Sequence, residues 1–267
     1  MFTESREDAL QREILQTKLL SSIFTKAAKN EVVLKGGMAM RVSQGSHRKT
    51  KDIDLGQHPG IPLPKLQKLM RSAIKQTLSS GILEKYEVSE PKQTDTTARW
   101  KINGQTKGKT RVQLTVEVSR RGVPTPENLE TVEYFPPDEY KISPFLVDVY
   151  NGKTLAATKV IAMLQENRVA PRDLYDLHIL IRNEVTPPSD LLSDVDEEVL
   201  GESLEKLWDK IDMLDYDMFV DQVAPYLPKG VADRIDKNVY EEMRVEVGVH
   251  VEKWLNDAIE NKRGLLL

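Results

Sequence analysis

Cysteine is absent from the 267-residue sequence, which excludes disulfide bonds, thiolate chemistry and cysteine-based zinc sites. This absence is compatible with a reducing cytoplasm. The sequence also lacks the run of about 18 apolar residues that a membrane span needs, and its N-terminus lacks the apolar stretch of a signal peptide. We therefore expect a soluble, cytoplasmic protein with no membrane partner, long enough for one large domain or two small ones.

Histidine is also scarce. The four histidines are His47, His58, His178 and His250. Their wide spacing argues against a histidine-rich metal site, and neither a Gly-x-Ser-x-Gly elbow nor a Walker A sequence is present. The three tryptophans are Trp100, Trp208 and Trp254. We interpret these scattered residues as core anchors rather than as a base-stacking platform, and His178 as a packing residue on a helix.

Charge is distributed unevenly, although the formal net charge is only -4. Five Lys or Arg residues and no acid lie between residues 35 and 51, and eight basic residues face two acids between 92 and 121. Thirteen acids face two lysines between residues 184 and 221. A polyanion would therefore approach the N-terminal part, and the acidic C-terminal third is suited to a basic partner.

Hydrophobic periodicity predicts a mixed α/β part followed by helices. Helices are expected over residues 7–29, 38–42, 64–78 and 153–166, after Pro171, and throughout the chain beyond residue 188. Strands are expected over residues 31–34, 52–55, 83–88, 97–102, 111–118 and 145–149, with Asn103-Gly104 marking a turn whose loop extends through Gly108. This order predicts a core over residues 1–150 and a helical module over residues 151–267.

Asp52 and Asp54 lie two residues apart on a predicted strand. Because side chains alternate between the faces of a strand, both carboxylates leave the same face with their bases about 7 Å apart. Mg²⁺ takes oxygen ligands, usually one or two protein carboxylates together with substrate phosphates. The pair therefore predicts a site for Mg²⁺ or Mn²⁺, although Asp-x-Asp is also common on solvent-facing strands.

Lys35-Gly36-Gly37 lies between a predicted strand and a predicted helix, upstream of the acidic pair. Glycine permits a close backbone approach, and a helix N-terminus offers free N–H groups to phosphate. The segment therefore predicts a phosphate-binding turn, with an ordinary tight turn as the alternative. Arg41 and Arg48 either reach phosphate or acceptor, or simply remain solvated.

Glu117 supplies a third candidate carboxylate, because it follows Gln113 and Thr115 on the polar side of an alternating run. On a strand beside the acidic pair it would complete a metal cage and could accept the proton of an acceptor hydroxyl. The alternative is an ion pair between Glu117 and an arginine, for which Arg99, Arg120 and Arg121 are the candidates.

Two blocks of sequence carry a family resemblance. The first consists of residues 34–41 (LKGGMAMR) and 48–55 (RKTKDIDL), and the second of residues 157–159 (ATK), Arg168 and residues 172–177 (RDLYDL). Together they resemble the AbiEii/AbiGii-type nucleotidyltransferase toxins of bacterial type IV toxin-antitoxin and abortive-infection systems. This resemblance implies a polymerase-β-like nucleotidyltransferase core with a mixed sheet, followed by a helical C-terminal module that completes the NTP site.

The resemblance also implies roles for individual residues. Asp52 and Asp54 would bind Mg²⁺, Lys159 would contact the NTP phosphates, and Asp176 would be an essential acid that orients Lys159 or contacts ribose. Residues of the nucleotide site would be Lys35, Gly36, Gly37, Thr50 and Lys159. Met38 stands where the family usually has a hydroxyl residue, so a phosphate contact is missing there, whereas Thr50 retains a hydroxyl beside the metal acids.

The second block has an alternative reading as a salt-bridge network between two helices. Its members would be Lys159, Arg168, Arg172, Asp173 and Asp176.

The function expected from these residues is transfer of a nucleoside monophosphate from an NTP to an acceptor. By resemblance the acceptor is the 3′ end of tRNA, so that translation and growth stop, and a cognate antitoxin restrains the toxin. The basic stretches suit RNA phosphates. Nucleotidylation of a protein or small molecule, and a non-catalytic NTP-binding module, are the alternatives.

Overall fold

The computed structural model describes residues 6–29, 31–58, 60–165, 168–193 and 195–264. Within these ranges the chain divides into two compact units. Unit 1 comprises Met1–Ser43 and Lys49–Tyr150, and unit 2 comprises Gln44–Arg48 and Asn151–Leu267. The chain thus enters unit 2 briefly and returns to unit 1 before it reaches Asp52.

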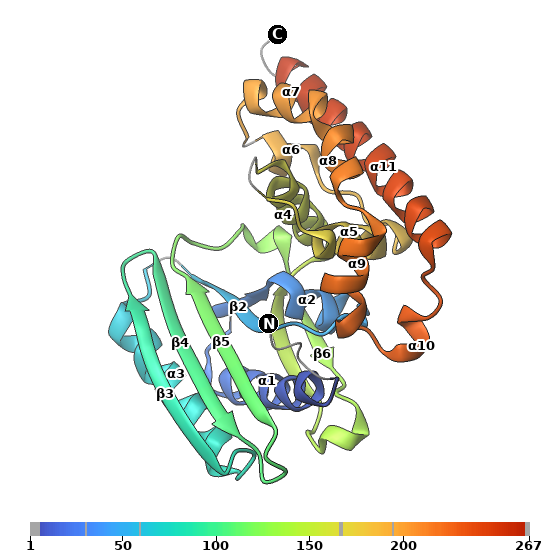
Figure 1. Ribbon diagram of the computed structural model, residues 1–267. Helices are drawn as coiled ribbons and strands as arrows, with labels where there is room; N and C mark the ends of the chain where they lie inside the picture. The colour runs from blue at the N-terminus through green and yellow to red at the C-terminus, as the bar shows by residue number, and fades with distance from the viewer. Residues whose placement is uncertain (1–5, 30, 59, 166–167, 194, 265–267) are drawn as a thin grey trace. The chain divides into compact units, whose positions relative to one another are not determined.

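Unit 1 is built on a seven-stranded mixed sheet. Its strands are β1 (Val32–Lys35), β2 (Asp52–Gln57), β3 (Lys85–Gln93), β4 (Thr97–Gln105), β5 (Arg111–Ser119), β6 (Leu129–Tyr134) and β7 (Phe145–Tyr150). Their order across the sheet is β3-β4-β5-β2-β1-β7-β6 (Figure 1). β2 runs parallel to β5 and antiparallel to β1, so the strand that carries Asp52 and Asp54 is the central strand of the sheet.

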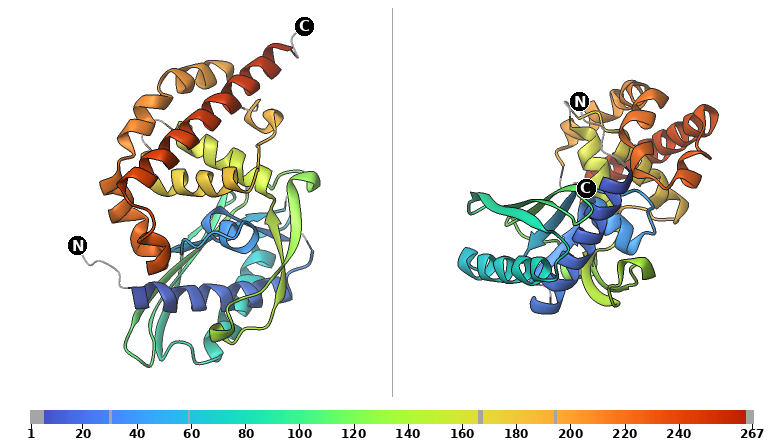
Figure 2. Two further views of the ribbon diagram at one scale, coloured as in Figure 1. Left: turned by 90° about the vertical axis from the view of Figure 1, so that its right-hand side faces the viewer. Right: turned by 60° about the horizontal axis from the view of Figure 1, so that its bottom comes forward.

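Helices cover one face of the β3–β5 part of this sheet. The helices of unit 1 are α1 (Arg6–Lys26), α2 (Gly36–Ser43), α3 (Leu63–Ser79), and the short η1 (Pro126–Asn128) and η2 (Asp138–Tyr140). α1 and α3 lie on the same side of these strands (Figure 2). α1 packs one apolar stripe inward, since Leu15, Leu19 and Ile23, four residues apart, are fully buried.

The opposite face of β4 and β5 stays open to solvent. Val112, Leu114 and Val116 of β5 are buried, whereas Gln113 between them is exposed, which is the alternation of a half-buried strand. β4 alternates in the same way, with Trp100 buried and the next residue, Lys101, exposed. Unit 1 therefore buries one face of this part of the sheet and presents the other.

The prediction of a turn at Asn103-Gly104 is wrong. Both residues lie inside β4, where Asn103 pairs with Gln113 and Gly104 with Val112, and the strands reverse only at residues 106–110. Gly104 has a packing reason instead, because a Cβ there would lie 2.5 Å from Leu83 Cδ1 and 2.8 Å from the Lys85 carbonyl oxygen. The glycine permits a close approach of neighbouring backbone rather than a change of direction.

Unit 2 is helical. Its helices are α4 (Gly152–Leu164), α5 (Pro171–Arg182), α6 (Ser189–Ser193), α7 (Glu197–Glu205), α8 (Leu207–Met213), α9 (Tyr216–Gln222), η3 (Ala224–Tyr226), α10 (Lys229–Ala232) and α11 (Lys237–Gly264). The Asn151 side chain caps α4 by accepting a 3.0 Å hydrogen bond from the Thr154 amide. α11 is the longest helix and packs along α5, α6, α7 and α8 (Figure 2). The ring centroid of its Tyr240 lies 4.9 Å from that of Phe219 in the core.

The mixed α/β fold followed by helices is confirmed. Trp100 and Trp254 are buried as expected, Trp208 is partly buried, and His178 contacts Glu246 of α11 at 2.7 Å. The edge strand β6 was not expected, because its charged and polar residues give no clear apolar alternation. In the described part of the chain, none of the helices combines the length and the apolar character that crossing a membrane requires.

Gly104→Ala is expected to destabilise unit 1 by about 1–3 kcal/mol, because the added methyl group overpacks against Leu83 and the Lys85 backbone. Gly108→Ala is the matched control in the following turn, where the nearest atom, Thr106 Oγ1, would lie 3.7 Å from the new Cβ. Thermal unfolding of both variants checks this. Equal melting temperatures would contradict the packing role.

Candidate active site

The glycine turn joins the end of β1 to the start of α2. Gly36 adopts a left-handed φ of 69°, which a residue with a side chain adopts only with strain. A Cβ at Gly36 would also lie 2.5 Å from Asp54 Oδ2. The turn therefore places the N-terminus of α2 directly against the Asp54 carboxylate.

Asp54 lies in a row of charged residues that crosses four strands. The pairing register sets Lys35 of β1 opposite Asp54, Glu117 of β5 opposite Asp54, and Arg99 of β4 opposite Glu117. Paired residues of adjacent strands project from the same face of a sheet. Asp52, which is exposed, lies in the next row of that face, opposite Thr115.

Glu117 is engaged by its other neighbour. Arg99 Nε donates to Glu117 Oε2 at 2.9 Å, and Arg99 Nη2 contacts the same oxygen. The structure thus contains the ion pair that was the alternative reading of Glu117, and the direct cross-strand position of Arg99 explains it. Among the described side chains, no group of three or more Asp, Glu or His residues is arranged to hold a metal ion.

Two residues of α1 hold the segment that leads into the acidic strand. The Gln16 amide, which is fully buried, donates to Thr50 O, Thr50 Oγ1 and Asp52 O, each at 3.2 Å. Arg12 Nε donates to Thr50 O at 3.0 Å, and the Thr50 hydroxyl donates to Asp52 O at 3.0 Å. The Thr50 hydroxyl is therefore used to fix the backbone of Asp52.

Arg12 and Gln16 were not among the site residues predicted from the sequence. A polar pair at positions i and i+4 on one helix also describes an ordinary solvated face, so the sequence offered no distinguishing signal. Their burial, which follows from packing α1 on the sheet, is what identifies them.

Arg41 is also turned inward. Its guanidinium contacts the buried Glu13 of α1, and Lys49 lies 3.7 Å from the same carboxylate. The residue considered for phosphate binding thus ties α2 to α1. Burial raises the pKa of the neighbouring Tyr140, and the nearby Glu13 carboxylate acts in the same direction.

Unit 2 holds Lys159 and Asp176 in one buried ion-pair network. Lys159 Nζ lies 2.9 Å from Asp173 Oδ1 and 2.6 Å from Asp176 Oδ2. Arg48 reaches the same acid with a bidentate pair, Nε to Oδ1 at 3.0 Å and Nη2 to Oδ2 at 2.7 Å. Arg168 binds Asp173 Oδ2 through Nη2 at 2.7 Å.

This network matches the salt-bridge reading of the second block, with one exchange of members. Arg48 takes part, whereas Arg172 is exposed and enters no ion pair within the described ranges. Arg48 therefore does not lie solvated at the surface, as one reading of the sequence had it. Lys159 uses two of its three N–H donors on carboxylates and keeps one for another partner.

Electrostatics keep Asp176 ionised in spite of its burial. Burial by itself would raise the pKa of this carboxyl group, but attraction to Arg48 and Lys159 and the hydrogen bonds from both outweigh it and lower the pKa. Burial likewise opposes the charge of Arg48, yet its contacts with Asp176 raise the Arg48 pKa. Both groups are therefore charged at neutral pH.

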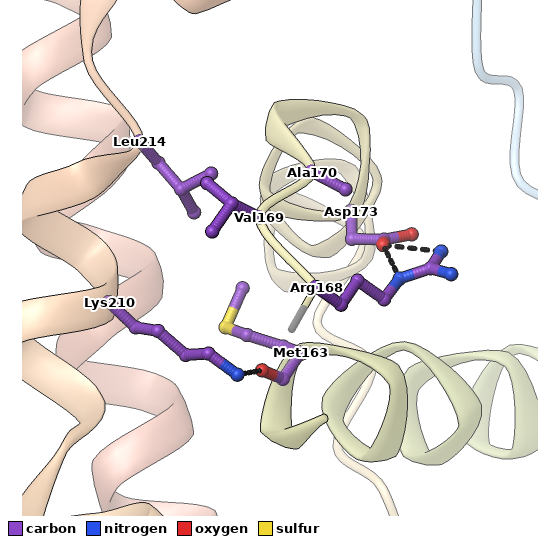
Figure 3. Close-up of a pocket in the computed structure, with 7 residues that line it drawn as sticks. All are labelled: Met163, Arg168, Val169, Ala170, Asp173, Lys210 and Leu214. Atoms are coloured by element: carbon purple, nitrogen blue, oxygen red, sulfur yellow. Dashed lines mark hydrogen bonds and ion pairs between the residues drawn. The ribbon is translucent and has the colours of Figure 1, made fainter. Parts of the chain in front are cut away.

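A small hollow lies beside this network, between α4, α5 and α8. Arg168 and Asp173 line one side, and Lys210, which donates to the Met163 carbonyl oxygen at 2.6 Å, lines the other (Figure 3). Its free volume of about 10 Å³ is room for a single water molecule. The hollow is thus too small for a nucleotide.

The mixed sheet, the glycine turn and the paired acids are the features of a nucleotidyltransferase, and comparisons with known proteins assign this class. The family model described as nucleotidyl transferase AbiEii toxin, type IV TA system, matches residues 18–255. The chain belongs to this family of toxins, whose type IV systems pair each toxin with a cognate antitoxin. No curated protein sequence matches the chain.

Two solved structures show the same fold. JHP933 from Helicobacter pylori is 19% identical, with a TM-score of 0.57 and an alignment that covers 98% of each chain. The nucleotidyltransferase toxin MenT4 from Mycobacterium tuberculosis is 14% identical, with a TM-score of 0.52, over 96% of this chain and 93% of that one. At these identities the likeness concerns the fold.

Gly36→Ala is expected to lower the rate of nucleotide transfer by at least about tenfold, because the methyl group displaces the Asp54 carboxylate. Gly45→Ala is the matched control: its φ of 67° imposes the same backbone strain of about 1–2 kcal/mol, but no atom lies within 4 Å of the new Cβ. Both variants should have a lower melting temperature than wild type, and only Gly36→Ala should have a lower rate of nucleotide transfer. Equal rates would contradict the contact with Asp54.

Gln16→Leu is expected to destabilise the protein by about 1–3 kcal/mol, since buried carbonyl oxygens lose a donor. It should also lower the rate of nucleotide transfer, because the backbone of Asp52 is no longer fixed. Gln11→Ala, on the exposed side of α1, serves as control. A lower melting temperature with an unchanged rate would show that Gln16 contributes to packing alone.

Proposed function

We propose that this toxin transfers a nucleoside monophosphate from an NTP to the 3′ end of tRNA, with Mg²⁺ or Mn²⁺ as cofactor. The acceptor hydroxyl oxygen forms a bond to the α-phosphorus, the bond from that phosphorus to the bridging oxygen breaks, and pyrophosphate leaves. The observation that carries the proposal is the contact between the Gly36 turn and Asp54. It brings a helix N-terminus, which favours phosphate, next to a carboxylate that favours a divalent cation.

The acids present fit a divalent cation. Asp52 and Asp54 supply hard oxygen ligands from one face of β2, which is the number of protein carboxylates that Mg²⁺ commonly takes when phosphates provide the rest. When bound, the metal neutralises the charge that phosphoryl transfer develops. Glu117 would act as a third ligand or as the proton acceptor only after release from Arg99. We therefore assign cation binding chiefly to Asp52 and Asp54.

The remaining residues of the proposed site either bind phosphate or position another residue of the site. Gly36 and Gly37 offer backbone N–H groups at the start of α2, and Lys35 adds a positive charge one residue earlier. Thr50 positions Asp52. Lys159 has one donor left for the triphosphate, and Asp176 holds its ammonium group in position.

tRNA as acceptor is supported by the family resemblance and by the basic stretch over residues 92–121 of unit 1. In the other basic stretch, Arg41 and Lys49 contact Glu13 and Arg48 contacts Asp176. Blocking the 3′ end would prevent charging and so stop translation. The excess of acids over residues 184–221 is complementary in charge to a basic partner such as the antitoxin.

Asp54→Asn is expected to lower the rate by about a hundredfold or more while the melting temperature changes little, because the amide keeps the shape but loses the charge that binds the cation. Asp95→Asn is the matched control, since Asp95 is a fully exposed acid of the same unit. Glu117→Gln should lower the rate less than Asp54→Asn does, because the Glu117 carboxylate is paired with Arg99. Full activity of Asp54→Asn would contradict the metal assignment.

The acceptor is tested by incubating the protein and Mg²⁺ with each α-labelled NTP in turn, together with tRNA and total cellular protein. Label is expected on RNA at the 3′ end. Label on protein alone would contradict the tRNA assignment and leave nucleotidyl transfer standing.

A further inference from the structure

The exposed face of β3, β4 and β5 continues directly from the acidic strand. We call this surface the open sheet face; it consists of the alternate residues of β4 and β5 that include Lys101 and Thr115, and their neighbours in β3. The register connects it to Asp52, because Asp52 pairs with Thr115 and Thr115 pairs with Lys101. At about 4.8 Å between strands, Lys101 lies about 10 Å from Asp52 along the sheet.

The open sheet face carries an excess of uncompensated positive charge. Its basic residues are Lys85, Lys92, Arg99, Lys101 and Arg111. Arg99 is neutralised by Glu117, and Glu87 is the other acid of these rows. None of the ion pairs found in residues 6–29, 31–58, 60–165, 168–193 and 195–264 includes the four remaining cations.

Two further properties restrict the kind of ligand. The face is lined by polar side chains such as Asn103, Gln113 and Thr115, whose amide and hydroxyl groups are suited to hydrogen bonding with phosphate and sugar oxygens. The aromatic residues of these strands, Tyr86 and Trp100, alternate to the other face, so bases find no stacking platform here. These properties favour a backbone polyanion over an apolar or acidic protein segment.

We propose that the open sheet face binds the sugar-phosphate backbone of the RNA acceptor next to its reactive 3′ end. The proposal rests on the proposed function and adds the surface that holds the acceptor. Lys101 lies in the row of Asp52, and Lys92 lies in the row of Asp54 through Arg99 and Glu117. Contacts of this kind fix position and are indifferent to base sequence.

The test compares charge reversal on the two sides of the same sheet. Lys101→Glu changes the open sheet face, and Lys68→Glu makes the same change on α3, which covers the opposite face and is likewise exposed. The full-length protein is titrated with tRNA by filter binding without NTP at several NaCl concentrations. Transfer kinetics then give KM for tRNA and for the NTP separately.

We expect Lys101→Glu to raise the Kd and KM for tRNA about tenfold at low salt while the KM for the NTP stays unchanged. Lys101→Ala should reduce the slope of log Kd against log salt by about 0.7, the value of one phosphate contact on a single strand. Changing the bases near the 3′ end of a synthetic RNA should leave both effects unchanged. Lys68→Glu should behave like wild type.

Equal tRNA binding by Lys101→Glu and Lys68→Glu, with wild-type labelling of RNA, would overturn the surface while leaving the proposed function intact. An effect of Lys101→Glu that depends on the base sequence would overturn backbone recognition. Label on protein instead of RNA in the wild-type reaction would refute the RNA acceptor itself. Melting temperatures of both lysine variants near wild type exclude misfolding as the cause.

Discussion

The pairing register of the central strand is the constraint on which the rest of the site depends. It places Asp54 and Glu117 side by side, with Lys35 next to Asp54 on one side and Arg99 next to Glu117 on the other, so that a basic residue flanks each acid. A shift by one residue would turn these side chains into the apolar layer beneath α1 and α3 and bring Ile53 and Leu55 to the surface. The buried neighbours of the acids therefore enforce the position of the acids.

The central acids carry like charges on neighbouring strands, which by itself is unfavourable. Arg99 offsets the charge of Glu117, and the start of α2 lies against Asp54, where the positive end of the helix is favourable for a carboxylate. Gln16 and Arg12 hold the backbone of the entering segment from the other side. The strand that carries Asp52 and Asp54 and the glycine turn beside it are thus held in place by contacts within unit 1.

Much of this arrangement could be predicted from the sequence. Alternation placed Asp52 and Asp54 on one face of a strand, and paired glycines after a β-rich run indicated a strand-to-helix turn. Local pattern could not reveal that α1 buries Gln16 against Thr50, because burial depends on packing between segments 34 residues apart. The same limit applies to Gly104, because a glycine is required there by the close approach of Leu83. It also applies to β6, which is a strand because it pairs with β7 and not because of its own composition.

The contacts of Asp176 distinguish between the two roles that the sequence motif allows, orienting Lys159 or contacting ribose. Both of its carboxylate oxygens are occupied within unit 2, by Arg48 and by Lys159, and its side chain has no exposed surface. A ribose hydroxyl would have to displace one of these partners and leave a buried cation unpaired, which costs several kcal/mol. Orienting Lys159 requires no such exchange. The same carboxylate also anchors Arg48, four residues before Asp52 in the chain, so it fixes the end of the short segment that unit 2 takes from the N-terminal part.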